Sequence, residues 1–287
     1  MHPAPSVIVF TVLSGLGFGL MAFLALFPPT PGWPALLHWG LAYGLAAAGL
    51  VASTFHLGNP QRALRAFSQW RTSWLSREAW ASVAALLVLA PVAVADIFAL
   101  PVRWTLALPG AVLAGLAVLA TAMIYTAIRA VPRWHSPLTP VLFLGFAATG
   151  GAILSGQPAA APAALALALL LRLAFVIGDG AFARAGQTMG TATGLGGQVA
   201  VFEWPHTGDN YLLREMIFTV ARRHAEKLRL VAVVLAGLVP AALLLVLPAH
   251  PLTAAAAAAS HLVGAFAARW LFFAEAEHVV GLYYGRR

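Results

Sequence analysis

The chain has no cysteine and few charged residues, and both absences restrict what it can be. Without cysteine it cannot build a disulfide, a thiolate-ligated zinc site or an iron–sulfur cluster from its own side chains. Any redox centre must be held by histidine or methionine, be an unligated organic molecule, or lie on a partner. Charged residues make up 9% of the 287 residues, against about 25% in a soluble domain. A chain so poor in charge cannot cover its own surface in water.

Hydrophobic residues make up 61% of the chain and come in runs long enough to cross a bilayer as helices. The predicted spans are residues 6–27, 35–57, 79–100, 105–128, 138–156, 160–180, 229–248 and 252–273. The fifth is the weakest, because it is short and glycine-rich. No clear cleavage site follows the first run, so we interpret it as a helix and not a removed signal. The sequence therefore predicts an all-α integral membrane protein, a bundle of about eight transmembrane helices forming a single domain over residues 1–287.

The net charge of +8 comes from arginine and lysine in alternate loops. The basic residues of these loops are Arg62, Arg65, Arg71, Arg77, Arg129, Arg133, Arg184, Arg214, Arg222, Arg223, Lys227, Arg229, Arg286 and Arg287. The other loops carry almost no charge, so the positive-inside rule places the basic loops and both termini in the cytoplasm of a bacterial inner membrane. The rule also accounts for the positive net charge, so the charge does not indicate binding to nucleic acid. The one long segment between spans, at about residues 181–228, is predicted to be cytoplasmic or interfacial.

Several ionisable residues fall at or near the predicted cytoplasmic ends of helices. His56 ends the second span, where an imidazole can bond a quinone carbonyl and exchange its proton; an interfacial histidine that caps the helix is the simpler alternative. Arg172 lies roughly 21 Å from the outer end of the sixth helix, and Asp179 follows two turns later. Arg172 and Asp179 are predicted to line a polar cavity, against the alternative that Arg172 snorkels to the surface. Tyr125 is a further quinone candidate or a member of the aromatic belt.

Two further groups carry alternatives. His38 and His261, on different helices, suit the axial ligands of a b-type haem, the edge of an outer quinone site, or polar helix contacts. Basic and aromatic residues alternate between the second and third spans, where they predict lipid headgroup contacts or a docking surface for a partner. The docking candidates are Arg62, Arg65, Arg71, Trp74 and Arg77.

Two motifs carry a resemblance to a known family. Phe55-His56-Leu57-Gly58-Asn59-Pro60, followed by Ser73-Trp74-Leu75-Ser76-Arg77-Glu78, is similar to the signature of the DmsC family, the membrane anchor subunits of dimethyl sulfoxide reductase-type molybdoenzymes. Tyr125 with Pro132-Arg133-Trp134-His135-Ser136 resembles the same family. The segments 205–216 and 272–285 resemble its SoeABC-type sulfite dehydrogenase branch.

The resemblance implies a division of labour between subunits. A molybdopterin subunit would oxidise sulfite to sulfate, and an iron–sulfur subunit with [4Fe–4S] clusters would dock on the cytoplasmic face and pass electrons to the anchor. The anchor would bind a quinone, ubiquinone or menaquinone, with His56 at the family's quinone site, and would carry no haem and no metal. The alternatives are a quinol-oxidising anchor of a terminal reductase, a haem-carrying cytochrome b anchor, and a transporter with Arg172 and Asp179 on its substrate path.

Overall fold

The computed structural model describes residues 1–287 except 56, 102–103, 204–207, 209, 218–223 and 286–287. Its described residues form an all-helical bundle without strands, so the predicted fold class is confirmed. The long helices are α1 (Pro5–Leu26), α2 (Trp33–Thr54), α3 (Trp74–Ile97), α4 (Trp104–Thr126), α5 (Leu138–Leu154), α6 (Ala160–Asp179), α10 (Ala225–Val233) with its continuation, and α12 (Pro251–Ala274). The continuation of α10 runs through a π-helical turn, η4 (Val234–Leu238), into α11 (Val239–Val246).

Seven helical stretches of the described chain are long and apolar enough to cross a membrane. The remaining apolar helix, α5, is shorter, with 17 residues. This agrees with the prediction that the fifth span is the weakest. The shorter elements are η1 (Pro60–Phe67), α7 (Ala181–Arg184), α8 (Met189–Thr193), α9 (Tyr211–Glu215) and η5 (Val279–Tyr284). Helix α9 begins after Asn210, whose side chain accepts a hydrogen bond from the N–H of Leu213.

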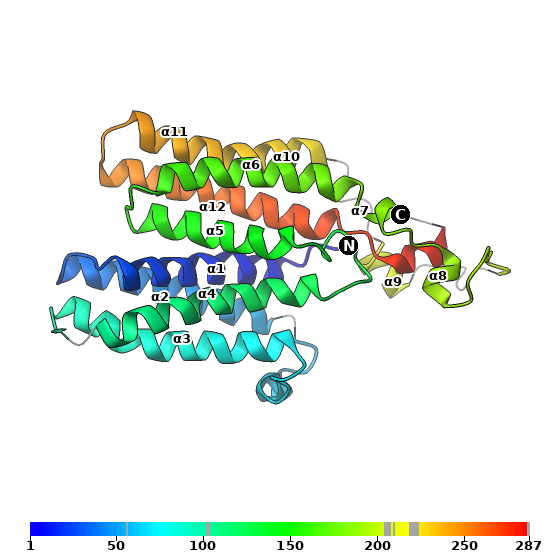
Figure 1. The fold of residues 1–287 in the computed structure, drawn as a ribbon, viewed down its shortest axis with the longest axis horizontal. Coiled ribbons are helices and arrows are strands. Elements are labelled where there is room, and N and C mark those ends of the chain that lie inside the picture. The colour runs from blue at the N-terminus through cyan, green and yellow to red at the C-terminus, as the bar shows by residue number, and fades with distance from the viewer. Residues whose placement is uncertain (56, 102–103, 204–207, 209, 218–223, 286–287) are drawn as a thin grey trace.

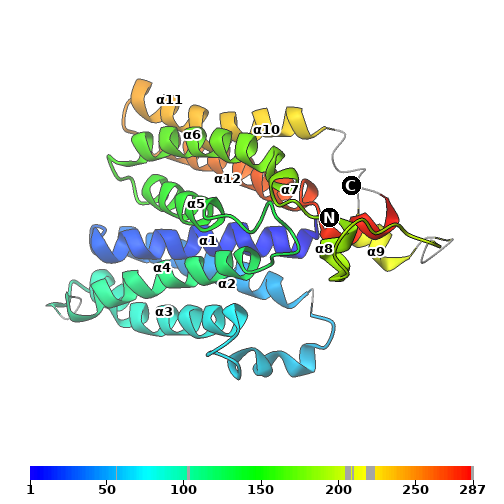
Figure 2. The same ribbon diagram turned by 45° about the vertical axis from the view of Figure 1, so that its right-hand side comes forward.

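Helix α1 lies in the middle of the bundle, with α3 and α4 on one side and α6, α10 and α11 on the other (Figures 1 and 2). Small residues allow the central contacts. A Cβ on Gly19 would lie 2.0 Å from the carbonyl oxygen of Ala147, and one on Gly49 would lie 2.4 Å from the nitrogen of Ser14. Glycine at these positions therefore sets how closely α1 approaches α5 and α2, as in other membrane bundles.

The π-helical turn η4 has a partner on α12. A π-helical turn shifts the backbone hydrogen bonds of a helix and leaves carbonyl groups for other donors. The Ser260 hydroxyl donates to the Leu235 carbonyl (2.9 Å), and His261 bonds the Ala236 carbonyl through Nδ1 (2.8 Å). His261 is fully buried in this contact. His38 likewise bonds a carbonyl through Nδ1, that of Pro34 (2.7 Å). His261 thus joins α12 to η4, whereas His38 bonds a carbonyl of its own helix; the roles of both histidines stay predictions.

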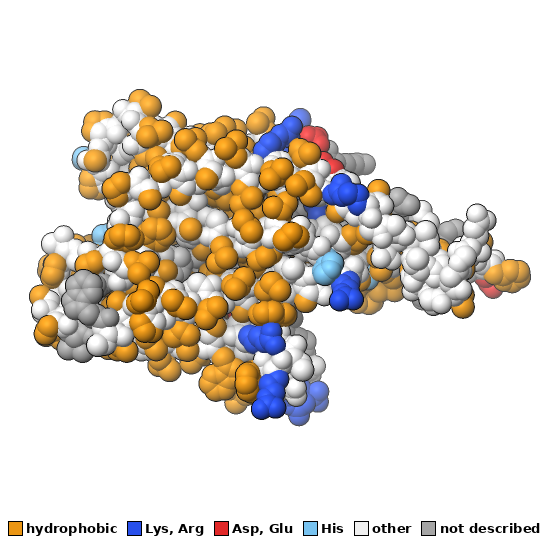
Figure 3. Space-filling model, viewed as in Figure 1, with side chains coloured by type: hydrophobic (Ala, Val, Ile, Leu, Met, Phe, Trp, Pro, Cys, Tyr) orange, Lys and Arg blue, Asp and Glu red, His pale blue; other side chains and the backbone are white. Residues whose placement is uncertain are grey.

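The charged side chains gather at one end of the bundle. Figure 3 shows Lys and Arg side chains at this end of the visible face, while the apolar flank is covered with hydrophobic side chains. The segment that follows α6 projects beyond the same end, where the N- and C-termini also lie (Figure 1). The nitrogen of Met1 donates to the Ala276 carbonyl (3.0 Å), and Val279 donates to the Ala130 carbonyl (2.9 Å). The placement of this end in the cytoplasm stays a prediction from the loop charges.

Candidate functional site at the charged end of the bundle

A cavity of about 500 Å³ opens between α5, α6 and α12 at the charged end of the bundle. The linker between α4 and α5 and the residues after α6 complete its wall. Most of the lining is apolar and aromatic, including Leu142, Phe143, Phe146, Leu171, Phe175 and Phe272. The charged residues of the lining are Arg129, Arg133, Arg184, Arg269 and Glu275. Apolar walls with a few polar groups are typical of binding sites for small organic molecules.

Arg269 is the most deeply placed cation of this cavity. It is 6% exposed, and its guanidinium carbon lies 3.5 Å from the ring centroid of Phe143 and 5.5 Å from that of Phe272. No hydrogen bond or ion pair joins it to another described residue. It also lines a much smaller cavity on the opposite side, shared with Ser14 and Thr121. A buried guanidinium without an ionic partner is costly, so it is a candidate for ligand binding.

A network of ion pairs closes the charged end beside the cavity. The Glu275 carboxylate accepts from Arg133 Nη2 (2.5 Å) and Arg229 Nε (2.6 Å). Asp179 pairs with the same two arginines, at 3.2 Å from Arg133 and through Arg229 Nη1 at 2.8 Å. A Cβ on Gly178 would lie 2.8 Å from the Arg133 guanidinium carbon, so the glycine leaves room for this side chain. The network joins α6, α10 and the end of α12.

Tyr125 belongs to an aromatic cluster and does not line the cavity. Its ring packs edge-on against Trp134, Phe272 and Phe273, with centroids 5.3–5.5 Å apart. The Trp134 indole donates to the Phe272 carbonyl (2.8 Å), which fixes the linker after α4 on α12. Tyr125 is 9% exposed and packed among these rings. Its role at a quinone stays a prediction.

Glu78 is a buried acid that sequence reasoning did not single out. It is 5% exposed inside the bundle near the charged end of α3, and its carboxylate accepts a hydrogen bond from the Thr121 hydroxyl of α4 (2.5 Å). The predicted third span begins at residue 79, which leaves Glu78 in a loop, whereas α3 begins at Trp74. Extending that span by one helical turn would have placed this acid within a predicted transmembrane helix. Such residues are expensive there and mark functional sites.

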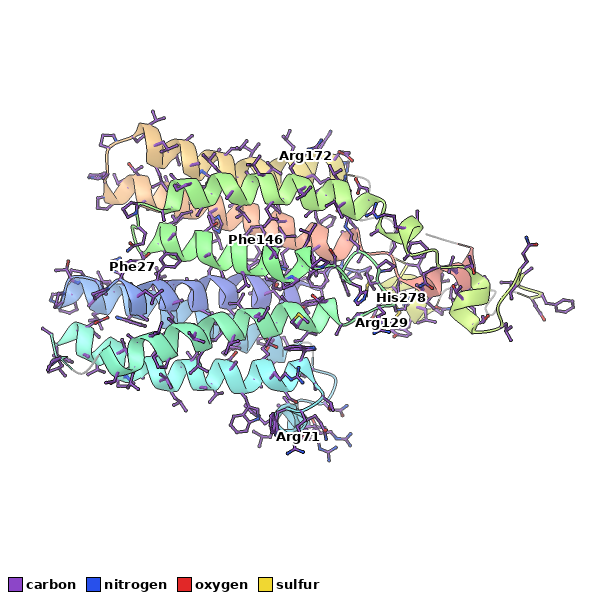
Figure 4. The ribbon with its side chains drawn as sticks, viewed as in Figure 1. Phe27, Arg71, Arg129, Phe146, Arg172 and His278 are labelled. Atoms are coloured by element: carbon purple, nitrogen blue, oxygen red, sulfur yellow. The ribbon has the colours of Figure 1, made fainter. Side chains whose placement is uncertain are left out.

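The other predicted quinone residues are not brought together. His56 lies outside the described residues. Arg172 is exposed on the outer surface of α6 (Figure 4), as the snorkelling alternative expects, and it does not line the cavity. Asp179, predicted to share a polar cavity with Arg172, bonds Arg133 and Arg229 instead. The roles of His56, Arg172 and Asp179 at a quinone stay predictions.

The predicted docking residues form an exposed shelf beside α3. Arg62, Arg65 and Arg71 are exposed, and Figure 4 shows Arg71 pointing away from the bundle. Arg77 holds the shelf: it donates to the carbonyls of Trp70 (3.0 Å) and Arg71 (2.6 Å) and stacks on Trp74 at 4.3 Å. The Trp80 indole bonds the Phe67 carbonyl (3.0 Å). The structure thus leaves Arg62, Arg65 and Arg71 accessible, while Arg77 is half-buried.

The fold and site define a multi-pass membrane protein with a charged end, a cavity there and a basic shelf. The described residues contain no group of three or more His, Asp or Glu side chains placed to hold a metal ion. The chain belongs to the DMSO reductase anchor subunit (DmsC) family, whose model matches residues 1–274. It is 34% identical to the C subunit of the sulfite dehydrogenase of Allochromatium vinosum, over 99% of each chain. No solved structure matches the chain. The predicted family is thereby confirmed, and the chain is the membrane subunit of an oxidoreductase complex.

Proposed function

We propose that this chain is the quinone-reactive anchor of a complex that oxidises sulfite to sulfate in the cytoplasm. The observation that carries the proposal is the full-length similarity to the C subunit of a sulfite dehydrogenase, because both chains are covered almost completely. In the reaction, sulfite and water give sulfate, two protons and two electrons. This step takes place on a molybdopterin subunit, and the electrons reach the anchor through the [4Fe–4S] clusters of an iron–sulfur subunit. This chain has no cysteine, so those clusters belong to the partner.

The role of this chain is to hold the quinone and supply protons as the quinone accepts two electrons. We assign the first proton-handling position to His56, at the end of α2, on the family resemblance. Glu78, buried on α3 twenty-two residues later in the sequence, supports this placement because it supplies a second protonatable group at the charged end. Tyr125 on α4 remains a candidate near α3, whereas Arg172 and Asp179 remain candidates on α6, on the other side of α1 (Figure 1). The quinone is ubiquinone or menaquinone of the bacterial inner membrane.

We assign the shelf of Arg62, Arg65, Arg71, Trp74 and Arg77 to the iron–sulfur subunit. The exposed arginines beside tryptophans have the composition of an interface anchor. The positive-inside rule places this shelf in the cytoplasm, where the molybdopterin subunit would also lie. Docking there would bring the last cluster close to the end of α2.

The test is purification of the tagged chain from its native membrane, followed by identification of its partners and an assay of sulfite-dependent reduction of a short-tail quinone. We expect a molybdenum subunit and an iron–sulfur subunit to co-purify with sulfite:quinone activity. In the same background, His56→Ala should assemble and lose most of the quinone step, while sulfite-dependent reduction of a soluble dye continues. His224→Ala, an exposed histidine before α10, is the matched control.

The outcomes separate the parts of the proposal. Normal assembly and unchanged quinone reduction in His56→Ala would refute the role of His56. The same partners without sulfite activity would refute the substrate, and a quinol-dependent reductase activity would reverse the direction of electron flow. Recovery of the chain alone in good yield would refute the anchor function itself.

A further inference from the structure

We propose that the cavity between α5, α6 and α12 is a quinone-ring site separate from the end of α2, with the Arg269 guanidinium as the donor to a ring carbonyl. The inference rests on the proposed function, that the chain exchanges electrons with quinone. It adds a location away from His56, at which the resemblance places the quinone, although residues of the motifs at 132–136 and 272–285 line it.

The dimensions and walls of the cavity fit a planar ring. Its volume of about 500 Å³ lies within the range of roughly 300–1,000 Å³ found for small-molecule sites. The rings of Phe143, Phe146, Phe175 and Phe272 line it. Aromatic walls favour a flat, conjugated ligand, which can stack on them, over a flexible acyl chain.

The guanidinium of Arg269, which lines the cavity, suits a carbonyl oxygen as its acceptor. Arg269 lies five residues before the end of α12, about 7.5 Å along the helix from its charged end. Its guanidinium is held over the Phe143 ring at 3.5 Å and makes no hydrogen bond or ion pair to another described residue. Its N–H groups are therefore left for an acceptor in the cavity, because a guanidinium donates and cannot accept.

The other charged residues of the lining are Arg129, Arg133, Arg184 and Glu275. Glu275 is already balanced by Arg133 and Arg229. A ring carbonyl, whose oxygen carries a partial negative charge, therefore meets no unbalanced carboxylate as it approaches Arg269.

The cavity also has a way out for the isoprenoid tail. Ile177 lines the cavity and is 39% exposed on the outer surface of α6, and Leu138 at the start of α5 is partly exposed. The lining therefore reaches the lipid-facing surface. A ring in the cavity would leave its tail among the lipids.

The experiment is photolabelling of the assembled complex with a short-tail azido-quinone, with the labelled peptides identified by mass spectrometry. We expect saturable labelling within residues 138–146, 171–178 or 268–272. Arg269→Gln should weaken labelling about tenfold or more, because a hydrogen bond to a charged group contributes about 1.5–3 kcal/mol. Arg269→Lys should restore part of it.

A second pair of variants keeps the test independent of the buried arginine. Ala174 lines the cavity, and Ala174→Phe should fill it and remove the label. Leu173→Phe adds a ring on the lipid-facing side of the same helix, where Leu173 is 49% exposed, and should leave labelling unchanged.

Labelling confined to the end of α2 in an active complex would overturn the second site and keep the proposed function. Labelling of the cavity that Ala174→Phe and Arg269→Gln do not change would also overturn it, as would a phospholipid that stays in the cavity and blocks the label. A complex with neither labelling nor quinone activity would refute the proposed function and this inference together.

Discussion

The guanidinium of Arg269 on α12 stacks 3.5 Å above the ring of Phe143 on α5, inside the bundle. The contact holds a permanent cation among apolar side chains and ties two helices that lie far apart in the sequence. Phe143→Leu should lower the free energy of unfolding of the purified complex by about 2 kcal/mol, because a desolvated cation–π contact contributes that much. Thermal unfolding in detergent measures the change. Phe98→Leu, at an exposed phenylalanine, is the control, and equal effects of the two variants would contradict the prediction.

The buried carboxylate of Glu275 should be far more important for stability than the exposed one of Glu226. Both bond Arg229, but the side chain of Glu275 is 5% exposed and that of Glu226 is 84% exposed. Glu275→Gln removes the buried one of the two carboxylates that balance Arg133 and Arg229, leaves only the half-exposed Asp179 to both, and should cost about 3 kcal/mol. Glu226→Gln should change stability by less than about 0.5 kcal/mol. The melting temperatures of the two variants measure this difference. A similar decrease in both would contradict the prediction that the buried ion pairs of Glu275 stabilise the fold.

Gly19 and Gly15 are matched glycines on α1 with opposite surroundings. A Cβ on Gly19 would lie 2.0 Å from the Ala147 carbonyl, whereas nothing lies within 4 Å of a Cβ on Gly15. Gly19→Ala should push α5 away and cost about 1–3 kcal/mol. Gly15→Ala should be neutral or stabilise slightly, since alanine favours a helix by about 1 kcal/mol over glycine. Yield and melting temperature in detergent provide the comparison; a well-folded Gly19→Ala variant would show that α1 and α5 pack differently.

The hydrogen bond from Thr121 to Glu78 should affect the quinone reaction. Thr121→Val keeps the shape of the side chain but removes the donor to a buried carboxylate, at a cost of about 1–3 kcal/mol. We expect slower sulfite-dependent quinone reduction with dye reduction unchanged. Thr126→Val on the same helix removes only a bond to the Ala122 carbonyl and should behave like the wild type. Unchanged quinone reduction in Thr121→Val would leave Glu78 with a structural role alone.

His278, which lies beyond α12, should make the packing of the following residues depend on pH. Burial, and then the positive charge on the nitrogen of Met1, lower the pKa of His278 below its usual value of 6.5. The neutral ring accepts a hydrogen bond from the N–H of Val280 at the start of η5 (3.0 Å). The unfolded imidazole therefore takes up a proton at higher pH than the folded one. The contribution of the neutral His278 to stability is fully present above pH 6.5 and is lost as the pH falls below that value.

Hydrogen exchange of residues 276–284 at about pH 7.5 and about pH 5.5 measures this effect. His278→Asn supplies the same kind of cap without a titratable group, so its exchange should be independent of pH in this range. Faster exchange of both proteins at low pH would assign the effect to another residue.

The elements themselves could be predicted almost completely from the sequence. Each transmembrane helix is a local property, because a run of apolar residues long enough to cross hydrocarbon must satisfy its own backbone hydrogen bonds. The predicted third span begins five residues late, since the polar run Ser76-Arg77-Glu78 resembles a loop when only hydropathy is read. That shift hides Glu78, the buried partner of Thr121.

The candidate site could be predicted less well, because depth along a helix does not say which way a side chain points. Arg172 and Arg269 occupy similar depths in apolar helices. The structure turns Arg172 outward and Arg269 into the bundle over Phe143. Likewise, the sequence pairs Asp179 with Arg172, its neighbour along the chain, but the partners of Asp179 are Arg133 and Arg229 from other parts of the fold.

The sequence by itself determined the membrane location, the number and order of the helices, the family, and the end at which charge gathers. These follow from composition and period along the chain. Only the tertiary structure decided that α5, α6 and α12 enclose a cavity, that Arg269 faces it, and that Glu275 and Asp179 share two arginines. The reason is physical: a cavity and an ion-pair network exist between helices, and their geometry depends on which faces meet when small residues such as Gly19 let those helices approach.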